Sequence, residues 1–233
     1  MWILISILLA CATTFAQQAS KRPAATNPAP RPKLDLIQLG TFHQGEAEFL
    51  SGGGWIGLIP SRDGFAWAKF RIKTEKVNDP IGKDPPEVKR ATQITLETPS
   101  ADEPLFLLRG LSQLVSKPVH TCFDRSENGS FLEQNPILLT CEATAYSIQV
   151  TNQRLVQLKQ AGKTQTLFTW PQALSEEHAE LIWAGDLDGD GKLDLLLDHS
   201  SHYNATGLTL YLSTWAGPGQ LVGRAATFKT VGC

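Results

Sequence analysis

The 233-residue sequence lacks an excess of charge of one sign, since 21 Lys and Arg residues stand against 23 Asp and Glu residues. With a formal net charge of −2, the chain has no global positive field to hold nucleic acid or an anionic membrane. Several enzyme signatures are also missing: the G-x-S-x-G elbow, the H-E-x-x-H zinc helix, the P-loop and any Cys–His nucleophile signature. These absences narrow the enzyme classes that the chain can belong to.

Long apolar segments are missing as well, and the apolar run at residues 2–10 is too short to cross a bilayer as a helix. Small residues and Thr14-Phe15-Ala16 follow it, so residues 1–16 are predicted to be a signal peptide cleaved after Ala16. Residues 17–33, rich in Ala and Pro and without an apolar period, predict a disordered tether. We therefore expect a secreted or periplasmic protein.

An alternative for the same segment is a lipid anchor. Leu8-Leu9-Ala10-Cys11 resembles a bacterial lipobox, in which the cysteine becomes the lipidated first residue. The protein would then be attached to a membrane of the cell envelope, and only through Cys11.

Cysteines are few, and cleavage after Ala16 would leave Cys122, Cys141 and Cys233. An oxidising compartment favours pairing two of them. The economical pair is Cys122 with Cys141, because it closes a loop of about 20 residues and contributes roughly 3 kcal/mol in the chain-entropy model. Cys233 is then free, or it takes one of the other two. Zinc is the weaker alternative, because the sequence has no C-x-x-C pair.

From residue 34 onward, short segments that alternate apolar and polar residues are separated by turn residues, which predicts strands. The clearest unit is a hairpin in which residues 55–59 and 65–73 flank the turn 60–64, with Lys69, Arg71 and Lys73 on one face of the second arm. Further strands are expected at 91–98, 105–109, 147–150, 154–160, 165–170, 180–185, 193–198, 208–213 and 222–228. The single helix candidate is the short segment 172–179.

This spacing predicts an all-β or β-dominated fold with antiparallel sheets. Residues 34–233 are expected to form one β-rich domain, with 34–115 and 116–233 as alternative subdomains.

One segment has the residues of a metal site, the D-x-D-x-D-G-x-x-D loop at 186–194. Ca²⁺ prefers six to eight oxygen ligands, and side chains at alternate positions of a tight loop converge on one point. The expected ligands are the carboxylates of Asp186, Asp188, Asp190 and Asp194 and the backbone carbonyl of Lys192, while Gly191 permits the sharp turn. Without a cation, four crowded carboxylates would repel one another, so a metal-free acidic turn is the weaker interpretation.

The loop is not an EF-hand, because the twelfth position holds Leu197 in place of Glu and the flanking runs are strand-like. With its flanks, at 184–197, it resembles the calcium loop of FG-GAP and VCBS-type repeats, which occur in integrin β-propellers and many exported bacterial proteins. The segments 207–212 and 221–228 match the following strands, so the resemblance implies one blade-like meander over 180–228. The motif occurs once, so a full propeller is less expected.

Downstream, a polar cluster offers a second interpretation: Asp198, His199, His202, Tyr203 and Asn204. They could hold another metal or serve a calcium-stabilised secreted hydrolase; alternatively, their side chains only hydrogen-bond back onto the aspartate loop. The main expectation is an exported calcium-binding protein with a structural ion and a binding or scaffolding role toward a protein or glycan. Whether it is an enzyme is left open.

The sequence has two weaker signals of ligand binding, a glycine-rich motif and a set of tryptophans. Residues 52–57 fit G-x-G-x-x-G but open a strand-like run, whereas a nucleotide site requires a helix N-terminus. Trp67 and Trp183 are expected in the core, and Trp215 is the best candidate for an exposed ring that stacks on carbohydrate.

Overall fold

The computed structural model describes residues 31–47, 51–62, 64–79, 85, 87–116, 119–123, 135–169, 179–200 and 205–230. Pro32–Cys233 form one compact unit and Met1–Arg31 another. The predicted signal peptide, the tether up to residue 30, most of the helix candidate at 172–179, and Cys233 lie outside the described residues. Within the described part of the chain, no helix has the length and apolar character that a membrane span requires.

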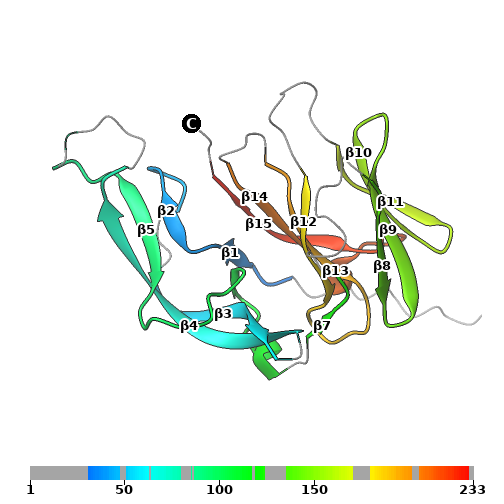
Figure 1. Ribbon diagram of the computed structural model, residues 1–233, viewed down its shortest axis with the longest axis horizontal. Helices are drawn as coiled ribbons and strands as arrows, with labels where there is room; N and C mark the ends of the chain where they lie inside the picture. The colour runs from blue at the N-terminus through cyan, green and yellow to red at the C-terminus, as the bar shows by residue number, and fades with distance from the viewer. Residues whose placement is uncertain are drawn as a thin grey trace, which may run out of the picture. The chain divides into compact units, whose positions relative to one another are not determined.

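The first sheet, sheet A, contains six antiparallel strands in the order β1-β6-β3-β4-β5-β2. They are β1 (Asp35–Ile37), β2 (Gly40–Phe42), β3 (Gly52–Ser61), β4 (Gly64–Val77), β5 (Ala91–Leu96) and β6 (Leu107–Arg109). The predicted hairpin is confirmed, because β3 pairs with β4 up to Ser61 opposite Gly64. Both long strands are strongly curved, so sheet A curls into a half-barrel (Figure 1). The short helix η1 (Ser112–Ser116) follows β6.

The second and third sheets come from the carboxyl-terminal half of the chain. Sheet C is the antiparallel meander of β8 (Ile137–Cys141), β9 (Thr144–Val150), β10 (Leu155–Gln160) and β11 (Lys163–Thr169). Sheet B is the meander of β12 (Glu180–Asp186), β13 (Asp194–Asp198), β14 (Gly207–Leu212) and β15 (Gly223–Lys229), extended beside β12 by β7 (His120–Thr121). The short helix η2 (Ser213–Trp215) follows β14.

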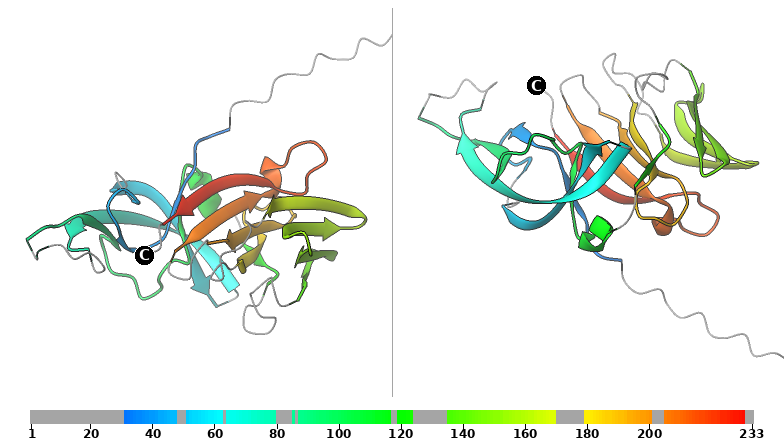
Figure 2. Two further views of the ribbon diagram at one scale, coloured as in Figure 1. Left: turned by 90° about the horizontal axis from the view of Figure 1, so that it is seen from above. Right: turned by 60° about the horizontal axis from the view of Figure 1, so that its bottom comes forward.

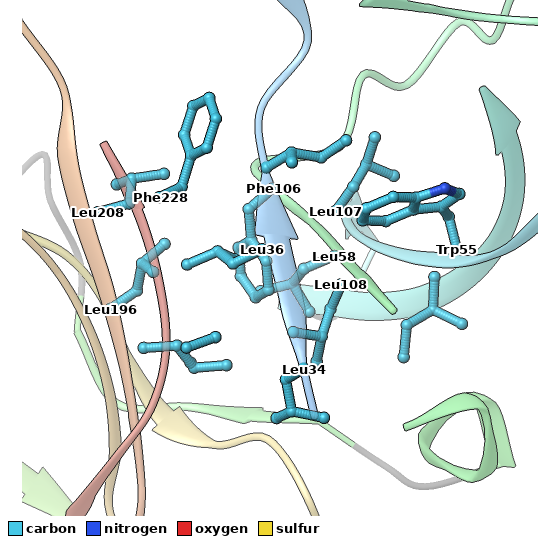
Figure 3. Packing of buried hydrophobic residues seen from close by; sticks show 14 of the residues in the cluster. Leu34, Leu36, Trp55, Leu58, Phe106, Leu107, Leu108, Leu196, Leu208 and Phe228 are labelled. Atoms are coloured by element: carbon cyan, nitrogen blue, oxygen red, sulfur yellow. The ribbon is translucent and has the colours of Figure 1, made fainter. Parts of the chain in front are cut away.

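Sheet B is the middle of three layers. One apolar core joins sheet A to one of its faces, and a second core joins sheet C to the other face. The views in Figures 1 and 2 agree that strands β12 to β15 lie between the half-barrel and the β8–β11 meander. In Figure 3, Leu36 of β1 lies between Leu196, Leu208 and Phe228 of sheet B and the interior of sheet A.

This position explains the apolar runs of the sheet B strands. Side chains alternate between the two faces of a strand, so a strand covered on both sides is apolar at most of its positions. In β13, Leu196 enters the core shared with sheet A, while Leu195 and Leu197 enter the core shared with sheet C. All three leucines are fully buried.

The predicted fold class is therefore confirmed: the molecule is β-dominated and antiparallel, and its described strands do not close into a propeller. Trp67 and Trp183 lie in the core as expected. The Cys122–Cys141 disulfide is present, with the two Cα atoms 5.3 Å apart, and it links the end of β7 in sheet B to the end of β8 in sheet C. Strands β1, β2, β7 and β8 were not predicted.

Candidate metal centre

The aspartate loop connects the two central strands of sheet B. Asp186 is the last residue of β12 and Asp194 the first of β13, and Gly185 pairs directly with Asp194. Gly189 and Gly191 have φ angles of 72° and 76°, a left-handed conformation that residues with a Cβ adopt only with strain. Two such positions let the chain reverse within seven residues, as predicted for Gly191.

Three carboxylates converge in this loop. Asp186, Asp188 and Asp194 each offer one oxygen, and these oxygens all lie within 4.8 Å of one another. Two ligands on opposite sides of a Ca²⁺ ion, each about 2.4 Å from it, would be about 4.8 Å apart. The spacing therefore fits a single ion of that size. Asp186 and Asp194 are buried, and Asp188 is partly exposed.

Hydrogen bonds hold two of these carboxylates rigidly in place. Asp186 Oδ1 accepts from the backbone N–H groups of Gly189 (2.7 Å) and Asp190 (3.2 Å), and its Oδ2 accepts from Gly191 N–H (2.8 Å). Asp194 Oδ2 accepts from Leu187 N–H (2.8 Å) and its Oδ1 from Ser213 N–H (2.7 Å). Asp186 is thus bound to the middle of the loop, and Asp194 is bound both to the loop and to the β14–β15 turn.

The β14–β15 turn supplies two hydroxyl groups to the other aspartates. Thr214 Oγ1 donates to Asp188 Oδ2 (2.6 Å), and Ser213 Oγ donates to Asp190 Oδ2 (2.9 Å). Asp190 also accepts from Lys192, through its backbone N–H (2.9 Å) and its Nζ (3.2 Å). The second oxygen of Asp188, Oδ1, is buried and has no hydrogen-bond partner among the described residues.

Electrostatics disfavour the ionised, metal-free loop. Burial raises the pKa of Asp194 well above its ordinary value, and the negative charge of Asp188 raises it further. Burial also raises the pKa of Asp188, with additional contributions from Asp190 and Asp186. A bound divalent cation would offset both the burial cost and the mutual repulsion. The possible ligands are carboxylate oxygens, and one of them, Asp188 Oδ1, has no partner in the described ranges, so the group fits a hard cation.

The loop is also anchored in both cores. Leu187 is fully buried in the core shared with sheet A, and its carbonyl accepts a hydrogen bond from Trp67 Nε1 of β4 (3.1 Å). Leu193 lies in the core shared with sheet C, where Tyr146 of β9 is hydrogen-bonded to its backbone. The conformation of one nine-residue loop therefore affects contacts with all three layers.

Of the five predicted ligands, the structure brings together Asp186, Asp188 and Asp194. The Asp190 carboxylate is bound to Lys192 and Ser213, and the role of the Lys192 carbonyl stays a prediction. Sequence reasoning missed Ser213 and Thr214. No local signal could have found them, because they lie 19 or more positions after Asp194 and reach the loop only through strand pairing.

The second candidate cluster lies at the opposite end of β13. Asp198 Oδ1 accepts from Gly207 N–H (2.8 Å), and His199 Nε2 is 2.7 Å from Thr209 Oγ1. The His199 ring stacks on Phe168, and burial lowers its pKa, with a smaller effect from Lys229 and Arg224.

Asp198 lies four positions after Asp194 on β13, about 13 Å along the strand, so this cluster is separate from the aspartate loop. His202 and Tyr203 lie outside the described residues. The hydrolase interpretation stays untested.

The two weaker sequence signals have ordinary structural roles. Residues 52–57 lie within β3, and no helix follows them, as expected. Trp215 in η2 is partly buried against the core shared with sheet A and is not a freely exposed ring.

Comparisons with protein-family models, with curated proteins and with solved structures found no match.

Proposed function

We propose that this chain is an exported calcium-binding β-protein in which the ion has a structural role. The observation that carries the proposal is the convergence of three carboxylate oxygens, one each from Asp186, Asp188 and Asp194, within 4.8 Å. The buried Asp188 Oδ1, which has no hydrogen-bond partner within the described part of the chain, supports it, since a buried acceptor without a donor costs free energy. A cation would satisfy this oxygen.

Calcium suits the site better than the other common metals. The described ligand groups are all oxygens, and zinc and copper favour His or Cys ligands, which are absent from this group. Magnesium holds its ligands at 2.0–2.1 Å and demands near-ideal octahedral geometry. Asp190 and the Lys192 carbonyl are proposed as the remaining protein ligands, as in the loops of FG-GAP and VCBS-type repeats.

The structural role follows from the anchors of the loop. Leu187 and Leu193 flank the aspartates and enter opposite cores. An ion that holds Asp186 and Asp194 together therefore secures the pairing of β12 with β13 and the contacts of sheet B with both neighbours.

Export and the biological role rest on separate observations. The disulfide between Cys122 and Cys141 is typical of proteins that fold in an oxidising compartment. Together with the predicted signal peptide, it supports a secreted or periplasmic location. We propose a binding or scaffolding role there, toward a protein or glycan partner.

Calorimetry and thermal melts of the full chain test the calcium site. Calcium should bind with measurable heat, and magnesium at the same concentration should bind far more weakly. At 100 times the dissociation constant, an ion that binds only the folded state stabilises it by about 2.7 kcal/mol. The melting temperature should then rise by about 5–10 °C over that in EDTA. Equal melts in calcium and in EDTA, with no heat of binding, would show the proposal to be wrong.

A further inference from the structure

A second candidate site lies on sheet A, and its residues are far from the aspartate loop in the sequence. It is a groove of about 660 Å³ between β3, β4, the segment after β5 and the start of η1. This volume is in the range of small-molecule sites. The polar residues that line it are Lys69, Arg71, Thr98, Ser100 and Ser112.

The groove depends on a β-bulge made of glycines. Gly52 pairs with Ile72 and Trp55 with Phe70, so Gly53 and Gly54 together lie opposite the single residue Arg71. A bulge interrupts the ladder and leaves backbone groups unpaired. Gly53 also leaves room for the guanidinium, because a Cβ there would be 3.0 Å from Arg71 Nη1. At Gly54, φ is 84°.

Two cationic side chains at this groove have N–H donors that no described residue accepts. Lys69 and Arg71 are two positions apart on β4 and therefore project from the same face, about 7 Å apart along the strand. Arg71 Nε donates to Glu97 Oε2 (2.8 Å), but among the described residues its Nη atoms have no acceptor. Lys69 likewise forms no ion pair with any described residue and is exposed.

We infer that this groove binds an oxyanion, a carboxylate, sulfate or phosphate group, carried on a small hydroxylated molecule. The free edge of the Arg71 guanidinium presents two N–H donors in the geometry that suits an oxyanion. Lys69 supplies a second charge, and the hydroxyls of Thr98, Ser100 and Ser112 offer donors and acceptors for hydroxyl groups of the ligand.

Four small molecules are titrated into the full chain in 1 mM calcium. Binding is measured from the NMR chemical shifts of the Gly53 and Gly54 backbone amides. Sulfate, glucuronate and glucose 6-phosphate should each shift these signals saturably, and glucose should not. Tighter binding of glucuronate than of sulfate would support a sugar acid as the ligand. Tighter binding of glucose 6-phosphate would support a phosphorylated one. No saturable shift with any anion, or an equal shift with glucose, would overturn the inference.

Variants separate recognition from nonspecific charge. Arg71→Gln and Lys69→Gln should each weaken anion binding about tenfold, because each removes a charged donor. Gly53→Ala should weaken it while keeping both charges, since its methyl group displaces the guanidinium. Lys163→Gln, which removes an exposed charge on sheet C, is the matched control and should bind as the wild type does. Binding unchanged in Arg71→Gln and Lys69→Gln would also overturn the inference.

Discussion

The aspartates of the loop differ in burial and in hydrogen bonds, so their charges affect stability and calcium binding differently. Asp194 is fully buried, and both of its oxygens accept backbone hydrogen bonds. Asp188 has one oxygen bound to Thr214, and its other oxygen has no hydrogen-bond partner among the residues that the structure describes. Removing the charge at these two positions should therefore have different consequences, although the chemical change is the same.

Asp188→Asn should weaken calcium binding by at least about tenfold, because a carboxylate ligand is lost. In EDTA, however, the same variant should be as stable as the wild type or up to about 1 kcal/mol more stable, since a buried charge beside Asp186 and Asp190 is removed. Calorimetry and thermal melts in calcium and in EDTA measure both effects.

Asp194→Asn should be destabilised by about 1–3 kcal/mol in either condition, because an amide has one acceptor oxygen and a backbone N–H loses its partner. Asp102→Asn, the same change at an exposed position in the segment between β5 and β6, is the control and should behave as the wild type does. If Asp188→Asn bound calcium as tightly as the wild type, Asp188 would not be a ligand.

At the scale of elements, the segments that connect the strands make the contacts that hold the aspartate loop and join sheet C to sheet B. The β14–β15 turn brings Ser213 and Thr214 onto the aspartate loop. The disulfide connects the edge strand β7 of sheet B to the edge strand β8 of sheet C, while the backbone N–H of Cys122 donates to the carbonyl of Ala184 in β12 (2.9 Å). Sheet C is therefore joined to the central sheet covalently as well as through its core.

Replacing both members of this disulfide should lower the stability substantially. Cys122→Ala with Cys141→Ala removes a cross-link over 19 positions, which contributes about 3 kcal/mol in the chain-entropy model. The melting temperature should fall by about 6–12 °C for a chain of this size. Cys233→Ala, which removes a thiol outside the bridge, should melt as the wild type does. A double variant that melts within 1–2 °C of the wild type would contradict this role of the bridge.

At the scale of the whole molecule, sheet B is covered on both faces, and its loop contacts both cores. One bound ion can therefore stabilise three layers together. The covalent bridge between Cys122 and Cys141 suits the proposed location outside the reducing cytosol.

Export is tested on the full-length chain produced in a bacterium with a periplasm. Mass spectrometry of the mature protein should give a chain that begins at Gln17. An acylated Cys11 would favour the lipid anchor instead, and an unprocessed chain would contradict both. In the control, Leu8→Arg with Leu9→Arg interrupts the apolar run and should abolish processing.

Some of the fold was predictable because it depends on local patterns. Alternation of apolar and polar residues predicted the β3–β4 hairpin and most strands of sheets B and C. The missed strands β1, β2 and β7 have only two or three residues, too few to show a period, and β8 directly follows an undescribed segment. The spacing of the aspartates likewise predicted that Asp186, Asp188 and Asp194 converge. It did not predict that the Asp190 carboxylate is hydrogen-bonded to Lys192 and Ser213 instead.

The sequence alone indicated the β class and the acidic loop with a turn at Gly191, since each depends on residues close together in the chain. It named Cys122–Cys141 only as the economical pairing, which the structure then decided. Only the tertiary structure decided that sheet B is the central layer. It also decided that Ser213 and Thr214 reach the aspartates, and that Gly53 and Gly54 make room for Arg71. These contacts join residues from separate strands, and their formation depends on sheet pairing and core packing, which local patterns do not encode.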